Sequence, residues 1–155
     1  MKRIICIGDN SNDGNTAGPL VHNELRGREM PDGVELVDGG LSGLDLLELV
    51  MGCEHVVFVD TVTGSDGPGS VRLIDDWTEV IERSGRHDHQ AGLGSLLEFL
   101  QQSAEGPVPE IQVVGLEPPF SETAIWRAAE ISLVAVMRER RALDRTRAAT
   151  RNRIA

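Results

Sequence analysis

The chain has 155 residues, a length that suits one domain built around one hydrophobic core. Its net charge of -10 argues against general nucleic-acid binding, which requires a basic surface. No stretch approaches the run of about 18 apolar residues that a membrane helix needs. The short apolar run at the start lacks the length and the cleavage site of a signal peptide. We therefore expect one cytoplasmic domain over residues 1–155, with no nucleic-acid or membrane partner. The oligomeric state does not follow from composition, and a monomer is favoured.

The charge is unevenly distributed along the chain. Residues 138–155 contain seven arginines but only Glu139 and Asp144 as acidic residues, a local net charge of +5, so the remainder carries -15. Arginines suit the negative end of a helix dipole, and they also suit contact with an acidic partner. The pattern indicates a basic C-terminal helix end or tail.

The first half of the chain alternates strands with helices. Residues 3–8 form an apolar strand, and a polar loop over residues 8–15 leads to a helix that starts at Thr16. A second strand over residues 34–37 ends at Asp38-Gly39-Gly40, which is good turn chemistry. The residues expected to face the core from the first helix are Ala17, Leu20, Val21 and Leu25.

A capping box at residues 42–45 predicts a second helix, with Leu44, Leu47 and Met51 facing inward. Residues 55–60 form a third strand that is continuously apolar, as expected for a strand buried on both faces of a parallel sheet. The later elements are an edge strand at 70–74, a short helix at 75–83, a helix with Leu93, Leu96, Leu97 and Leu100 inward, a strand at 111–115, and a final helix capped by Ser121 with Ile125, Ala129, Leu133 and Val136 inward.

This order of elements predicts an α/β fold with three layers: a mostly parallel, twisted sheet with helices on both faces. Ligands of such sheets bind beyond the carboxyl ends of the strands. The side chains expected at that edge are Asp9, Asn10, Asp13 and Asn15 after the first strand, Asp38-Gly39-Gly40 after the second, Asp60 at the end of the third, and His89 in a later loop whose edge is undetermined. Oxygen and imidazole together suit a first-row transition metal.

Each candidate also has a purely structural interpretation. Asp60 and Asp38 could serve turns or caps, and Asn15 is a natural N-cap for the helix that follows it. A single loop histidine such as His89 is more often solvated than functional. Cys6 and Cys53 lie in or beside apolar segments and are expected to be buried free thiols.

Several other classes of site lack their motifs. The chain contains no C-x-x-C, so a zinc ribbon or a thioredoxin-type site is excluded. Neither phosphate-loop motif is present, and no serine lies in G-x-S-x-G. A peptidase with this sequence is therefore not expected to use a serine or cysteine nucleophile.

Four stretches in order make the chain resemble the hydrogenase maturation endopeptidases over roughly residues 3–135. Residues 8–19 read GDNSNDGNTAGP, where the family has a glycine, a loop and D-D/E-G-V-G-P. Residues 38–47 read DGGLSGLDLL against D-G-G-T-x-G-x-x-L-L, and residues 57–62 read VFVDTV against V-x-V-D-A-V. Residues 88–93 read DHQAGL against S-x-H-x-x-G-L, and Val114-Gly115-Leu116-Glu117-Pro118 matches the late strand.

The resemblance implies an α/β peptidase that removes a C-terminal extension from the large-subunit precursor of a NiFe hydrogenase after nickel has been inserted. The nickel belongs to the substrate, and no organic cofactor is implied. The family's metal-contacting trio maps to Asn15, Asp60 and His89, and its substrate-recognition loop maps to Asp38-Gly39-Gly40.

Asn15 departs from the family pattern, which has an acidic residue at this position. An amide is a weaker metal ligand than a carboxylate and cannot act as a base. Asp13 could supply the missing carboxylate if the loop is shifted. The alternative function is that of a divergent, non-catalytic family member that binds the precursor or a related partner.

The resemblance leaves two mechanisms open. In the favoured one, the trio contacts the nickel of the substrate, and cleavage uses a metal-polarised carbonyl or water. In the other, Asp60 or Asp38 activates water as a general base. The first explains why cleavage follows nickel insertion.

Overall fold

The computed structural model describes residues 1–8, 16–40, 44–63, 66–80, 92–103 and 108–138. Five strands form one sheet in the order β2-β1-β3-β5-β4. Their bounds are Lys2–Ile7 for β1, Val34–Gly40 for β2, His55–Thr61 for β3, Val71–Ile74 for β4 and Glu110–Leu116 for β5. The first three neighbouring pairs are parallel, and β4 runs antiparallel to β5 at the edge. The mostly parallel sheet and its edge strand are confirmed.

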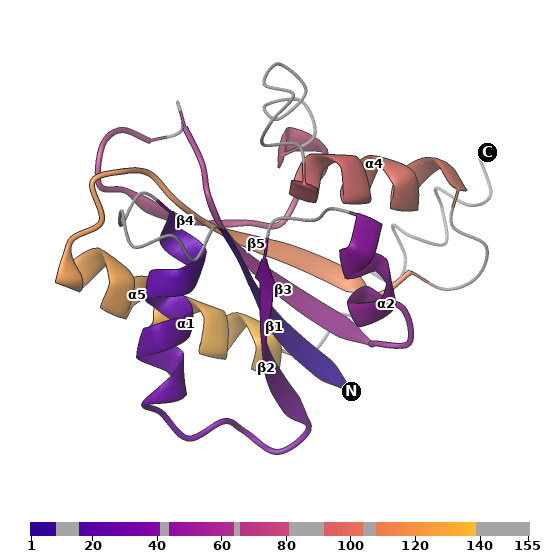
Figure 1. Ribbon diagram of the computed structural model, residues 1–155, viewed down its shortest axis with the longest axis horizontal. Helices are drawn as coiled ribbons and strands as arrows, with labels where there is room; N and C mark the ends of the chain where they lie inside the picture. Colours follow the sequence, from indigo (N-terminus) through magenta and orange to yellow (C-terminus); the bar gives the residue numbers. More distant parts are fainter. Residues whose placement is uncertain (9–15, 41–43, 64–65, 81–91, 104–107, 139–155) are drawn as a thin grey trace.

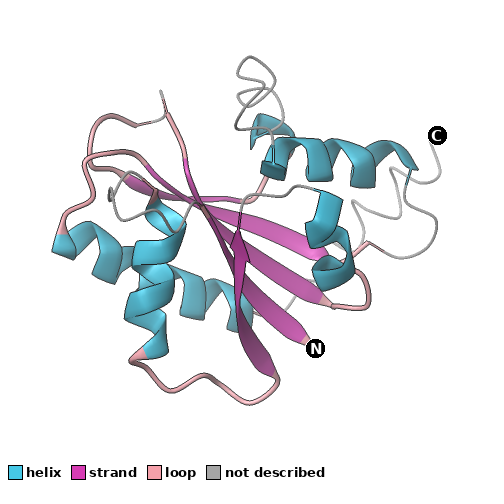
Figure 2. Ribbon diagram, in the orientation of Figure 1, coloured by secondary structure: helices cyan, strands magenta, loops and turns pink. Residues whose placement is uncertain are grey.

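Helices cover both faces of this sheet (Figure 1). One face carries α1 (Ala17–Arg26) and α5 (Glu122–Met137), and the other carries the 3-10 turn η1 (Leu44–Leu46), α2 (Leu47–Val50) and α4 (Gly92–Ser103). Figure 2 shows the resulting three layers, as predicted. Within the ranges that the structure describes, no helix has both the length and the apolar character that a membrane crossing requires.

Strand β1 shows why the sheet is covered on both sides. Alternate side chains of a strand point to opposite faces. Ile5 and Ile7 belong to the core cluster under η1, α2 and α4, whereas Ile4 and Cys6 belong to the cluster under α1 and α5. Its continuous apolar sequence therefore fills two cores.

Strand β2 is longer than expected. The strand was expected to end at Val37, with Asp38-Gly39-Gly40 as a possible turn, but Asp38 pairs with Cys6 and Gly40 with Ile7. The Gly8 N–H also donates to the Gly40 carbonyl at 3.0 Å. The strand is longer because pairing with β1 continues through Gly40, with a register shift between Cys6 and Ile7.

The prediction that Met51 faces inward is also wrong. Helix α2 is a single α-helical turn that ends at Val50, and Met51, just beyond it, is 37% exposed. Leu46 and Val50 fill the core instead. The expected capping serine at residue 42 lies outside the described residues.

Helix starts differ from the predictions at two further places. The N-cap of α1 is Thr16 rather than Asn15. The helix expected from residue 75 begins at residue 78, since Asp76 Oδ1 accepts the Thr78 N–H at 3.1 Å and residues 78–80 are helical. The cap of the final helix is confirmed, because Ser121 Oγ accepts the Ala124 N–H at 3.1 Å.

Candidate functional site

Asp60 lies at the carboxyl edge of the sheet, near the end of the central strand β3. The five preceding residues of this strand are buried, and they carry Asp60 to the point where burial becomes partial. Its register partner on β5 is Gly115, which has no side chain. A Cβ at Gly115 would lie 2.9 Å from both methyl carbons of Val62, so glycine lets the segment after β3 pass close to β5.

The carboxyl group of Asp60 titrates near neutrality. Burial raises the pKa of Asp60 from its ordinary value of 3.8 to about 7, and the Thr61 N–H, which donates to Oδ1 at 2.8 Å, opposes part of that rise. The protonated and ionised forms are then both populated near neutral pH. Such a group suits a metal contact or a proton transfer, both of which depend on the protonation state.

Helix α1 is attached beside Asp60 by two contacts that the sequence interpretation missed. The Ala17 N–H donates to Thr61 Oγ1 at 2.8 Å, which ties the first residue of α1 to the end of β3. Gly18 packs so closely on β1 that a Cβ there would lie 2.0 Å from the Ile7 carbonyl oxygen. The glycine just before Pro19 at a helix start was the available signal for this close approach.

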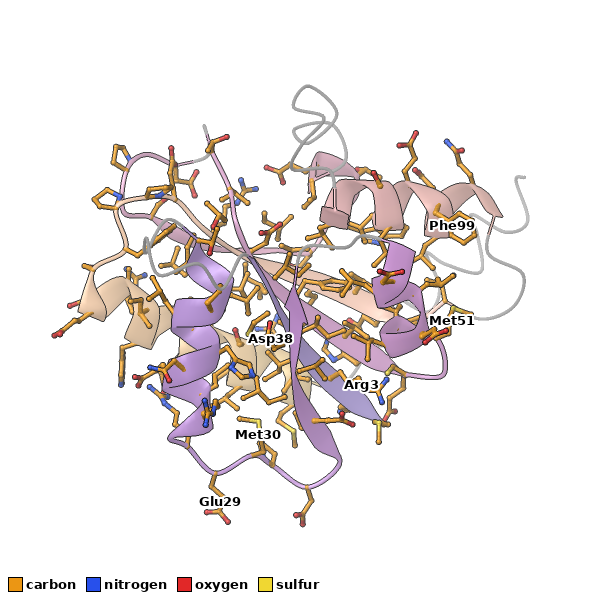
Figure 3. The ribbon with its side chains drawn as sticks, viewed as in Figure 1. Arg3, Glu29, Met30, Asp38, Met51 and Phe99 are labelled. Carbon is orange, nitrogen blue, oxygen red and sulfur yellow. The ribbon has the colours of Figure 1, made fainter. Side chains whose placement is uncertain are left out.

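Asp38-Gly39-Gly40 forms the end of β2 at the same edge, and Figure 3 labels Asp38 there. Asp38 is exposed, and its Oδ1 accepts the Gly40 N–H at 3.2 Å. A Cβ at Gly39 would lie 2.7 Å from Ile5 Cγ2, whereas Gly40, at φ +62°, has open space around its missing side chain. This strand end therefore presents accessible backbone.

Asp38 and Asp60 share an edge of the sheet but emerge on opposite faces. Asp38 is the register partner of Cys6, whose side chain lies in the core under α1 and α5. Asp60 is two residues from Phe58, which faces the core under α2 and α4. Strand alternation therefore separates the two carboxylates, and the geometry does not make them a carboxylate pair.

The two cysteines are free and buried, as predicted. Burial, with a smaller contribution from the negative charge of Asp38, raises the pKa of the Cys6 thiol far above its usual range. A thiol that stays protonated is a poor nucleophile and a poor metal ligand. Cys6 therefore acts as a small apolar side chain of the core.

Two members of the expected metal-contacting trio, Asn15 and His89, lie outside the described residues, as do Asp9, Asn10 and Asp13. Among the residues that the structure does describe, no three or more His, Cys, Asp and Glu side chains form a group able to hold a metal ion. Of the expected trio, Asp60 is the member that lies within the described residues.

The chain is similar in sequence to known hydrogenase maturation proteins. The sequence model of hydrogenase maturation proteases matches residues 19–132. The hydrogenase 2 maturation protease of Escherichia coli K12 is 29% identical over 98 residues, which cover 62% of this chain and 59% of that protein. The hydrogenase expression/formation protein HoxM of Azotobacter vinelandii is 31% identical over 91 residues, covering 57% and 43%. The chain thus spans less than two thirds of the length of these curated relatives.

Solved structures give longer matches. The hydrogenase maturating endopeptidase HybD from E. coli superimposes with a TM-score of 0.71 and 26% identity, covering 86% of this chain and 90% of that one. The solution structure of an endopeptidase from Escherichia coli gives a TM-score of 0.68 and 25% identity over 88% and 90%. The [NiFe] hydrogenase maturation protease HycI from Thermococcus kodakarensis KOD1 shares the fold, with a TM-score of 0.61 and 18% identity over 87% and 89%.

Proposed function

The chain belongs to the hydrogenase maturation protease family, and from this membership we propose that it is an endopeptidase that removes the C-terminal extension of a nickel-loaded NiFe hydrogenase large-subunit precursor. The nickel is carried by the substrate, and the reaction uses no organic cofactor. We place the protein in the cytoplasm, acting as a monomer on that precursor.

The observation that carries this proposal is the position of Asp60 at the carboxyl end of the central strand. A carboxylate with a pKa of about 7 stands at the carboxyl edge of the central strand, where ligands of α/β sheets bind. It occupies the position of the aspartate in the V-x-V-D motif of the family. An ionisable group kept in a buried strand at a cost in folding free energy is a candidate for a functional role.

Substrate binding is assigned to two sets of residues. From the family resemblance, Asn15, Asp60 and His89 contact the nickel of the precursor, and these three side chains offer oxygen and nitrogen donors suited to that ion. Asp38-Gly39-Gly40 contacts the polypeptide around the cleaved bond. The open space at Gly40 supports this role, because a peptide backbone can approach a glycine more closely than any other residue.

The reaction is hydrolysis of one peptide bond. Water adds to the carbonyl carbon, the C–N bond breaks, and the leaving nitrogen takes a proton to become the new amino terminus. In the mechanism that we favour, the nickel of the substrate polarises the carbonyl or the water, and Asp60 helps to position that nickel. In the second, Asp60 or Asp38 removes the proton from water as a general base. Cleavage that depends on nickel insertion follows from the first mechanism.

Substitution of Asp60 tests the proposal directly. Purified protein is incubated with nickel-loaded precursor from the same cell, and the precursor C-terminus is read by mass spectrometry. We expect wild-type protein to release a defined C-terminal peptide from nickel-loaded precursor and none from nickel-free precursor. Asp60→Ala should abolish release while retaining the circular dichroism spectrum of the folded protein.

Asp32→Ala is the matched control, since Asp32 is an exposed aspartate before β2, at the opposite end of the sheet. It should process the precursor at the wild-type rate. Full processing of the precursor by a folded Asp60→Ala protein would contradict the proposed role of Asp60. Tight binding without cleavage by the wild type would identify the divergent, non-catalytic member instead, and Asn15→Glu would then be expected to restore cleavage.

A further inference from the structure

A groove of about 520 Å³ lies between α1 and the first turns of α5, separate from Asp38 and Asp60. These two helices contact each other on one face of the sheet (Figure 1). Leu20 and Ile125 contribute apolar surface to the groove, and Trp126 forms part of its wall. A groove with an aromatic wall and apolar surface is suited to receive a polypeptide segment.

The charge of this groove is one-sided. Its charged lining residues are Glu24 and Glu122, and none of the described residues that line it is basic. Glu24 is paired with Arg28 at 2.9 Å, whereas the exposed carboxylate of Glu122 forms no ion pair with any residue in the described ranges. A positively charged side chain entering the groove would therefore meet a carboxylate that no basic side chain of the described residues neutralises.

Trp126 adds exposed aromatic surface, part of which is covered by a guanidinium of this chain. The indole is 53% exposed, a large exposure for a tryptophan on a helix packed against the sheet. The Arg28 guanidinium lies 5.7 Å from the centroid of its ring, and Glu24 and Glu130 both hold that guanidinium in place. Exposed tryptophans of this kind often dominate the binding energy of protein interfaces.

The groove lies close to the site edge of the sheet. Helix α1 starts at Ala17, which is bonded to Thr61 beside Asp60, and Leu20 follows less than one helical turn later. Glu122 is the first residue of α5, just after the loop that leaves the carboxyl end of β5. A polypeptide that reaches Asp60 can continue into the groove by crossing the carboxyl edge to the face of α1 and α5, the face on which Asp38 emerges.

We propose that the α1–α5 groove is a docking site for a segment of the precursor polypeptide that carries an arginine or lysine beside an apolar residue. This inference rests on the proposed function, because the polypeptide that reaches Asp60 is the one that extends into the groove. The cationic side chain pairs with Glu122, while the apolar residue packs on Leu20, Ile125 and the exposed part of the Trp126 ring. Docking here adds affinity for the precursor without touching the cleaved bond.

The test measures binding and cleavage separately. The dissociation constant of the nickel-loaded precursor is measured by calorimetry for wild type, Glu122→Lys, Trp126→Ala and Trp126→Phe, and cleavage is followed in parallel. We expect Glu122→Lys and Trp126→Ala each to weaken binding roughly three- to tenfold, with kcat unchanged at saturating precursor. Trp126→Phe should recover part of the loss, since it keeps an aromatic ring.

Glu98→Lys is the matched control, because it makes the same charge change at an exposed residue of α4 on the other face of the sheet. It should bind the precursor as the wild type does. Binding by the wild type should also weaken with added salt, more steeply than binding by Glu122→Lys.

The outcomes separate this inference from the proposed function. Unchanged affinity in both groove variants, or no binding of the precursor by the wild type, would overturn the docking site. Tighter binding by Glu122→Lys would overturn it as well, since it would mean that the occupant is not cationic. Wild-type protein that binds the precursor through Glu122 and Trp126 but leaves it intact would contradict the peptidase activity alone.

Discussion

At the scale of single residues, burial of the Asp60 carboxyl group costs folding free energy and also gives that group a protonation change near neutral pH. The Asp60 backbone continues a buried strand, while its ionisable side chain is half-buried at the end of that strand. Burial disfavours the charged form of a carboxyl group, so its pKa rises. The strand thus holds a group that changes its protonation state near neutral pH at the edge where the substrate is proposed to bind.

This cost should appear in the pH dependence of stability. Between pH 3.8 and about 7 the folded state keeps a proton that the unfolded state has lost, so the free energy of unfolding contributed by Asp60 falls as the pH rises across this range. Asp60→Asn stays neutral and can still accept the Thr61 N–H. We expect it to be more stable than the wild type at about pH 8, by on the order of 1–4 kcal/mol, and nearly equal at about pH 4.

Urea denaturation of both proteins across that pH range measures the difference. A gap that stays constant from low to high pH would contradict the raised pKa of Asp60.

The residue-level site was only partly predictable. Asp60 could be placed because a continuously apolar strand has one polar residue near its carboxyl end, and that position follows from the parallel sheet. The supporting contacts of Thr61 and Gly18 could not, because each joins residues that are distant in sequence. The opposite orientations of Asp38 and Asp60 depend on the register of β2 against β1, which pattern alone did not reveal.

At the scale of elements, the position of α1 depends on a backbone contact with β1. Gly18 brings the helix so near that a Cβ would lie 2.0 Å from the carbonyl oxygen of Ile7. Backbone cannot move aside as the end of a flexible side chain can. The start of α1, and with it the hydrogen bond from Ala17 to Thr61, therefore requires glycine at this position.

Gly18→Ala should lower the free energy of unfolding by roughly 2 kcal/mol or more, since α1 must move away from β1. Gly27→Ala is the matched control. Gly27 has φ -78° in the right-handed helical region, and a Cβ there would lie at an ordinary 3.5 Å from the Glu24 carbonyl oxygen. That change should be neutral or stabilise by up to about 1 kcal/mol.

Chemical denaturation midpoints of the two variants provide the comparison. Equal stability of Gly18→Ala and Gly27→Ala would show that α1 does not depend on the close approach at residue 18.

At the scale of the whole molecule, the sheet divides the interior into two cores. Ile4 and Ile5 are neighbours in the chain and both are 0% exposed, yet each belongs to a different core cluster. Ile5 also lies opposite Phe58 in the register between β1 and β3, and these two share a cluster. Neighbours in sequence are therefore separated by the sheet, while residues 53 positions apart pack together.

Double-mutant cycles can test this division. Ile4→Val and Ile5→Val should each cost about 0.5–1.5 kcal/mol, and their effects should add within about 0.5 kcal/mol because they leave gaps in different cores. Ile5→Val and Phe58→Leu should deviate from additivity, since both change one packed region. The reverse result, with coupling across the sheet and none within the cluster, would contradict the two-core arrangement.

The sequence by itself determined the class of fold, the chain order of strands and helices, and the position of Asp60 at a strand end, because these follow from local periodicity and from rules that hold for all parallel sheets. Four ordered motifs also sufficed to identify the family. The tertiary structure alone decided that Asp38-Gly39-Gly40 continues a strand, that the two carboxylates face opposite sides, and that α1 and α5 enclose a groove. Each of these depends on pairing or packing between segments that are distant in sequence, and a local sequence pattern does not specify such contacts.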